Sequence, residues 1–273
     1  MTFHYTIAEL QPYINWAYFY HAWQLHQPDE QKRLRLEAES FLREHVEHYR
    51  AHAVLLLADA HSDGDDIVLD SGERIPCLRQ QQEGSDYLCL ADFLSPLTSH
   101  HPSLTSHLSP LTSKIGLFAT SADQGLETDF AEDPYLKMMA QLLADRLAEA
   151  AAERLHEQVR KSIWGYARHE QLSIEEMHQE RFQGIRPAVG YPSLPDASIN
   201  FILDELLHMQ DIGITLTGSG AMRPHASVSG LMMGHPQAHY FSIGKIGDDQ
   251  VRDYAGRRGL PVETVRKFLA SNL

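Results

Sequence analysis

The segment from Gly184 to Pro195, GIRPAVGYPSLP, holds the residues with the clearest capacity for chemistry. Each of its three prolines fixes φ near −65° and pushes the preceding residue into an extended conformation, so we expect a stiff strap. Arg186 supplies a planar guanidinium that can grip a carboxylate through two parallel hydrogen bonds, and Tyr191 supplies an aromatic ring with a hydroxyl. A preorganised segment with these side chains suits small-molecule binding; a proline-rich connector is the competing interpretation.

The composition restricts the class of protein. The 273 residues, 43% of them hydrophobic, suffice for one large domain or two small ones with a sizeable core. A formal net charge of −14 argues against nucleic acid or an anionic membrane as the main partner. No apolar run reaches the roughly 18 residues of a transmembrane helix, and the first residues do not resemble a signal peptide. The only two cysteines, Cys77 and Cys89, favour a reducing compartment, so we expect a cytoplasmic protein.

The strap must be positioned by the elements around it. Residues 135–164 predict a long amphipathic helix, because apolar side chains recur every three or four residues after an N-cap at Asp133. Glu149 and Glu153 share one face of this helix, which we interpret as a solvated face with ion pairs. Further helices are predicted at 29–52 (with Leu34, Leu36, Phe41 and Val46 inward), after the capping box of Ser173 and Glu176, at 197–211, at 248–258 and from Pro261 onward. Short strands are predicted at 54–57, 67–70, 87–94, 114–122, 214–222 and 239–246, which favours an antiparallel sheet.

Residues 94–114 contain a seven-residue repeat that reads LSPLTSH, HPSLTSH and LSPLTSK. The repeat has no apolar face and is rich in Ser, Thr, Pro and His, so we interpret it as an inserted surface loop. A metal site built from its histidines is the weaker interpretation, because their spacing supplies no ligand geometry. The chain also has no P-loop, C-x-x-C or G-x-S-x-G motif, and we predict no metal site.

The sequence RPAVGYPSLPD at 186–196 closely resembles the R-P-A-x-G-Y-P-x-x-P-[DE] signature of the activation domain of cobalamin-dependent methionine synthase. The likeness extends in order along most of the chain, and residues 94–114 and 197–200 clearly depart from it. The matching blocks include INWAYFYHAW (14–23), LRQQ (78–81), YLCLADF (87–93), LADRLAEAAAERLHEQVRKSIWGYA (143–167), HASVSGLMMGHP (225–236) and DDQVRDYAGRRGLPVETVRKFLASNL (248–273).

The resemblance implies an α+β fold: a single C-shaped domain, residues 1–273, with a bent antiparallel sheet and flanking helices, one of them long. It also implies that the chain binds S-adenosylmethionine and supplies its methyl group for the reductive methylation of cob(II)alamin, which reactivates methionine synthase in methionine biosynthesis. The implied partners are the module that holds the cobalamin and a flavodoxin-type electron donor. A non-catalytic S-adenosylmethionine sensor or interaction domain is the alternative, and an excised domain and a free-standing protein both remain open.

The resemblance carries over site residues one by one. Arg186 matches the arginine that holds the methionyl carboxylate, Ala188 and Tyr191 match strap residues that line the ligand, and Tyr240 and Phe241 match a tandem aromatic pair that contacts it. No catalytic residue is implied in this chain, because reduced cobalt is the nucleophile and the protein contributes positioning.

The acidic residues of the family site are matched less completely. Glu149 and Glu180 match acids close to the ligand, whereas Asn15 stands where the family usually has an aspartate that meets the ligand's ammonium. An amide can accept a hydrogen bond but carries no charge, so weaker ammonium recognition is expected. His61 lies in a D-x-H-x-x-G match to cobalt-binding modules, but the chain has no Gly-Gly pair and the segment is predicted as a hairpin turn, so we interpret His61 as incidental.

Overall fold

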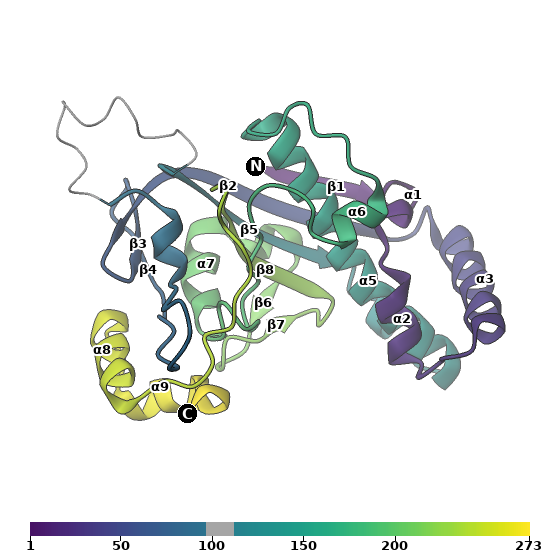
Figure 1. The fold of residues 1–273 in the computed structure, drawn as a ribbon. Coiled ribbons are helices and arrows are strands. Elements are labelled where there is room, and N and C mark those ends of the chain that lie inside the picture. Colours follow the sequence, from purple (N-terminus) through teal and green to yellow (C-terminus); the bar gives the residue numbers. More distant parts are fainter. Residues whose placement is uncertain (97–111) are drawn as a thin grey trace.

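A curled antiparallel sheet forms the centre of the computed structural model, which describes residues 1–96 and 112–273 (Figure 1). Its strands pair in the order β4-β3-β2-β5-β8, and β1 pairs with β2. The strands are β1 (Thr2–Thr6), β2 (Arg50–Asp63), β3 (Asp66–Leu69), β4 (Arg74–Pro76), β5 (Lys114–Ala122) and β8 (Ser227–Met232), while β6 (Thr215–Leu216) and β7 (Met222–Arg223) form a separate pair. The long β2 pairs with β1 and β5 along its first part and with β3 at its end, so one strand carries the curl of the sheet.

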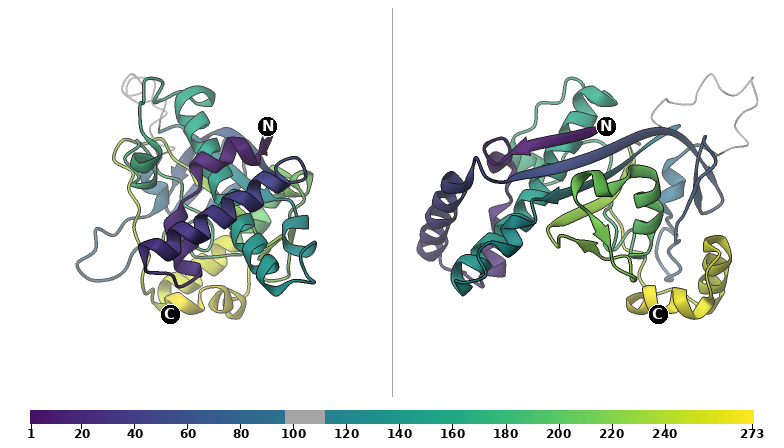
Figure 2. Two further views of the ribbon diagram at one scale, coloured as in Figure 1. Left: turned by 90° about the vertical axis from the view of Figure 1, so that its right-hand side faces the viewer. Right: turned by 180° about the vertical axis from the view of Figure 1, so that it is seen from behind.

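The helices cover both faces and both ends of this sheet. The helices are α1 (Ile7–Leu10), α2 (Trp16–Ala22), α3 (Pro28–His45), α4 (Gly125–Thr128), α5 (Pro134–Gln158), α6 (Ile174–His178), α7 (Ile199–Leu207), α8 (Asp248–Arg258) and α9 (Val262–Phe268). In Figures 1 and 2 the molecule is an arch, with β2 running along its top between α2, α3 and α5 at one end and α8 and α9 at the other. The predicted C-shaped α+β fold is therefore confirmed.

Alternation along the strands separates two hydrophobic clusters. On β2, Ala53 and Leu55 pack into the cluster that contains the apolar face of α5, whereas Val54 packs into the cluster that contains α7. Successive side chains of a strand point to opposite faces, so the sheet lies between the two helices. A third, smaller cluster joins α8 and α9 to the end of the arch.

The long helix α5 lies in the region that the sequence predicts. The Asp133 carboxylate accepts hydrogen bonds from the backbone N–H groups of Tyr135 (2.8 Å) and Leu136 (3.1 Å), which caps its first turn. One π-helical turn (Val159–Ile163) extends α5, and Gly165 follows with φ +76°. Its leucines at the predicted spacing, such as Leu143 and Leu147, are fully buried against the sheet.

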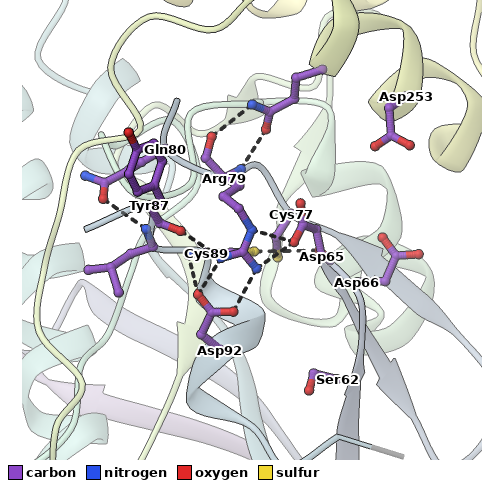
Figure 3. Close-up of polar contacts among 12 residues, drawn as sticks. Ser62, Asp65, Asp66, Cys77, Arg79, Gln80, Tyr87, Cys89, Asp92 and Asp253 are labelled. Carbon is purple, nitrogen blue, oxygen red and sulfur yellow. Dashed lines mark hydrogen bonds and ion pairs between the residues drawn. The ribbon is translucent and has the colours of Figure 1, made fainter. Parts of the chain in front are cut away.

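The predicted strand at 87–94 is wrong, because a 3₁₀ helix (Leu90–Phe93) occupies its second half. The Asp92 carboxylate accepts the Cys89 backbone N–H (2.8 Å) and two hydrogen bonds from the Arg79 guanidinium (2.8 and 2.7 Å), as Figure 3 shows. Arg79 also donates to Asp65 and to the Tyr87 carbonyl, so a cluster of partly exposed charged side chains holds the segment, rather than a strand ladder. A short apolar run cannot by itself distinguish a strand from a helical turn.

Two further expectations need correction, and one strand was not predicted. The predicted helix at 29–52 ends at His45, and its Leu36 is 57% exposed rather than inward. The segment 239–246 is not a strand, because its neighbour is the proline-rich strap, which offers isolated acceptors instead of a continuous ladder. The missed strand is β8, which forms the edge of the sheet beside the strap.

Most of the repeat, residues 97–111, lies outside the described residues. The residues on either side of it contact each other. The Ser95 backbone N–H donates to the Thr112 carbonyl (2.7 Å), and the two hydroxyl oxygens lie 2.6 Å apart. The chain therefore enters and leaves the repeat at two adjacent points on the end of the sheet.

Deleting residues 98–110 should leave the fold intact. Three residues would then connect Ser95 to Thr112, a common length for a hairpin connection. Loop closure changes by only about 0.6 kcal/mol per twofold change in length, so the thermal unfolding midpoint should stay within about 5 °C of the full chain. Insoluble protein, or a loss of cooperative unfolding by circular dichroism, would contradict the surface-loop interpretation.

Candidate ligand pocket

A cavity of about 700 Å³ opens between α5, the strap and the segment that precedes α8. All eight residues predicted for the site contribute to its wall, although they come from five separate parts of the chain. They are Asn15, Glu149, Glu180, Arg186, Ala188, Tyr191, Tyr240 and Phe241. Small-molecule pockets typically measure about 300–1,000 Å³, so the cavity is of the right size for a drug-sized ligand.

The strap extends the sheet beyond β8. Its Ile185 exchanges two backbone hydrogen bonds with Met233 (both 2.9 Å), the Pro187 carbonyl accepts from Leu231, and the Val189 N–H donates to Ser229. Ile185 and Val189 pack into the α7 cluster. Because side chains alternate along an extended segment, Arg186 and Ala188 point to the other face, toward α5 and the cavity.

Two glycines make this close pairing possible. Gly184 has φ +85°, and a Cβ atom there would lie 2.2 Å from the Met233 carbonyl oxygen. On the opposite strand, a Cβ at Gly230 would lie 2.3 Å from the Pro187 carbonyl oxygen. The far end of the strap is anchored by Asp196, which is 2% exposed and accepts a hydrogen bond from the Tyr254 hydroxyl of α8 (2.7 Å).

Arg186 is held against α5 by two bonds from its guanidinium. Nη1 donates to the Ala152 carbonyl (2.9 Å), and Nη2 donates to Glu153 Oε2 (3.1 Å). Burial alone would lower the pKa of Arg186, but the negative field of Glu153, with smaller effects from Tyr240 and Glu149, raises it. The guanidinium therefore stays charged, and its Nε edge donates to no protein atom among the hydrogen bonds of the described chain.

The other acids of the cavity differ in their surroundings. Glu149 forms an ion pair with Arg146 through two hydrogen bonds (2.8 and 3.3 Å). Glu180 has a positive φ of +57° and reaches solvent, but the protein covers part of its carboxyl group, and this desolvation raises the pKa of that group. The interpretation of Glu149 and Glu153 as a solvated face with ion pairs is wrong for Glu153, because its side chain is only 10% exposed.

The three aromatic residues predicted for the site also line the cavity. The Tyr240 hydroxyl accepts the Arg186 backbone N–H (2.9 Å), and burial raises the pKa of Tyr240. Phe241 exchanges backbone hydrogen bonds with the Ser193 hydroxyl of the strap. Tyr191 is 56% exposed at the mouth of the cavity. These bonds fix the aromatic pair beside the strap without a regular strand.

Asn15 lies in the wall and also stabilises the start of α2. Its Oδ1 accepts the Ala17 backbone N–H (3.2 Å) and caps α2. Sequence reasoning missed several other wall residues, notably Tyr13, Tyr18, Arg146, Glu153, His178 and Phe182. The spacing of four residues places Glu153 on the same helix face as Glu149, but no local pattern indicates that the strap covers Glu153.

Comparison with known proteins agrees with this architecture. The family model described as "Vitamin B12 dependent methionine synthase, activation domain" matches residues 6–259. The chain therefore belongs to this family. A solved structure, the "MetH Reactivation Domain bound to AdoHcy", is similar to this activation-domain chain with a TM-score of 0.90 and 37% identity, and the match covers 100% of this chain and 90% of the other.

Two further observations concern metal ions and membranes. Across residues 1–96 and 112–273, no three His, Cys, Asp or Glu side chains gather in a way that could hold a metal ion. Within the same residues, no helix has both the length and the apolar character needed to cross a membrane.

A pair of glycine substitutions tests the packing of the strap. Gly184 and Gly190 have nearly the same φ (+85° and +86°), so alanine at either position costs about 1–2 kcal/mol in the left-handed region. Only Gly184→Ala also meets a backbone oxygen, whereas Gly190 has open space around it. Urea unfolding should therefore show a larger loss for Gly184→Ala, by a further 1–3 kcal/mol or so. Equal losses would mean that the strap does not lie tightly against β8.

Proposed function

We propose that this chain binds S-adenosylmethionine in the cavity and supplies its methyl group to the cobalamin of methionine synthase. The observation that carries the proposal is Arg186, a buried guanidinium whose Nε edge is left for a ligand inside a cavity of suitable size. The family match and the S-adenosylhomocysteine-bound relative support the same ligand class, since that molecule is the demethylated product.

The charge of the cavity complements this ligand. Three glutamates and two arginines line the wall, so with its histidine neutral the wall carries one net negative charge (three minus two). S-adenosylmethionine carries a sulfonium, an ammonium and a carboxylate, which sum to one positive charge. The aromatic rings of the wall add a further attraction, because a cation over a ring face gains about 0.5–2 kcal/mol.

The proposed reaction requires this chain to position the ligand. The partner module's cobalamin, once reduced by one electron, supplies the methyl acceptor, and S-adenosylhomocysteine remains as the product. A flavodoxin-type protein is the electron donor we propose. This chain's residues hold the amino-acid end at Arg186 and fix the sulfonium near the aromatic wall, so that the methyl group faces the mouth at Tyr191. No proton has to move at the methyl group, so no general acid or base is required.

Reconstitution tests the proposal. The chain is mixed with the cobalamin-binding module of methionine synthase, a one-electron reductant and S-adenosylmethionine labelled in its methyl group. The label should appear on the cobalamin only when all components are present. Tight ligand binding without any transfer of label would instead favour a sensor or interaction domain.

Replacing Arg186 should weaken ligand binding about a hundredfold. One hydrogen bond to a charged group contributes about 1.5–3 kcal/mol, and tenfold in Kd corresponds to about 1.4 kcal/mol. Calorimetric titration of Arg186→Ala with S-adenosylhomocysteine measures the loss, and Arg186→Lys should recover only part of it, since an ammonium lacks the planar fork. Arg252→Ala removes an arginine whose side chain is 70% exposed on α8 and serves as the control. If the folded alanine variant binds within threefold of wild type, Arg186 is not the carboxylate anchor.

Asn15→Asp should tighten binding about fivefold at pH 7. A carboxylate there attracts the ligand's ammonium, by about 4 kcal/mol for unit charges 4 Å apart at an effective dielectric of 20, and desolvation cancels most of that gain. The cap of α2 should survive, because aspartate is as good an N-cap as asparagine. The gain should shrink as the pH falls and the new aspartate protonates. Equal or weaker binding by the variant would mean that the side chain at position 15 does not lie beside the ligand's ammonium.

A further inference from the structure

The two carboxylate oxygens of Glu153 have different surroundings. Oε2 accepts the hydrogen bond from Arg186 Nη2 (3.1 Å), whereas Oε1 is buried and has no hydrogen-bond partner among the residues that the structure describes. The side chain is 10% exposed and belongs to the wall of the cavity. A buried carboxylate oxygen without a donor is costly, and such groups in native proteins call for an explanation.

Among the described residues of the wall, neither the other two glutamates nor Asn15 fits this description. Both oxygens of Glu149 are taken by Arg146, and Glu180 is exposed to solvent. The Asn15 side-chain oxygen caps α2 and carries no charge. Glu153 is therefore the acid of the described wall that has a buried oxygen, Oε1, without a donor.

The adjacency of Glu153 and Arg186 defines the ligand group that fits. An α-amino acid carries its ammonium and its carboxylate on one carbon, so a site that recognises both needs an acid and a base side by side. The Arg186–Glu153 pair presents them 3.1 Å apart, one from the strap and one from α5. Arg186 offers N–H donors at its Nε edge, and Glu153 offers an acceptor at Oε1.

We propose that Glu153 is the ammonium receptor of this site. Oε1 accepts a hydrogen bond from the ligand's α-ammonium, while Oε2 holds Arg186 in the orientation that receives the α-carboxylate. This inference rests on the proposed function, and it narrows the ligand to molecules with an intact α-amino-acid end. It also accounts for a working site in which Asn15 supplies no charge.

Two ligands test the inference without altering the protein. One is S-adenosylhomocysteine, and the other is its deamino analogue, which keeps the carboxylate and has hydrogen in place of the amino group. Calorimetric titration of the wild-type chain should show at least tenfold weaker binding of the deamino analogue. Equal affinities would overturn the inference and leave the proposed function standing, whereas binding of neither ligand would overturn both.

Variants then locate the receptor. Glu153→Gln keeps an acceptor for Arg186 but loses the charge, so it should bind S-adenosylhomocysteine at least tenfold more weakly and discriminate between the two ligands by threefold or less. Glu47→Gln makes the same charge change at an exposed position between α3 and β2 and should behave as wild type. Retention of the full discrimination by Glu153→Gln, or its loss in Glu149→Gln instead, would assign the ammonium to another residue. Thermal unfolding of each variant confirms that the comparison is made on folded protein.

Discussion

The ion pair between Arg186 and Glu153 is the interaction on which the pocket depends. It joins the strap to the long helix, and both side chains are more than four-fifths buried. Removing one partner of such a pair typically costs about 3–5 kcal/mol, because the other charge is left without compensation. The pair therefore has two effects. It connects the strap to α5, and it places a positive and a negative group side by side in the cavity.

The rest of the fold brings this pair together. Asp133 starts α5 in the position that presents Ala152 and Glu153 to the strap about five turns later. Gly184 and Gly230 allow the strap to lie against β8, and the alternation of an extended chain turns Arg186 toward α5. Proline at 187 removes a backbone donor from the ladder but keeps the segment extended, so the strap loses little further freedom when a ligand binds.

Much of this architecture could be predicted from the sequence, and the failures have physical causes. Helix α5 and its cap follow from local signals. The eight predicted wall residues follow from the family resemblance, and Arg186, Ala188 and Tyr191 are the three that lie in its signature. The role of Glu153 could not be predicted, because an acid on a helix face is solvated unless a distant segment covers it, and that segment lies 33 residues away in sequence. The strand prediction for 87–94 failed for a similar reason. Asp92 accepts a hydrogen bond from Arg79, and no local sequence pattern indicates this contact. Residues 239–246 lack a ladder because their partner is rich in proline.

A crystal structure of the chain grown with S-adenosylhomocysteine would show whether Arg186 and Glu153 together receive an α-amino-acid group. We expect electron density for the α-carboxylate at the Nε edge of Arg186 and for the α-amino nitrogen within hydrogen-bond distance of Glu153 Oε1, with the Arg186–Glu153 bond retained. A ligand bound with its amino-acid end elsewhere, or an Arg186 side chain that leaves Glu153 to reach the ligand, would contradict it.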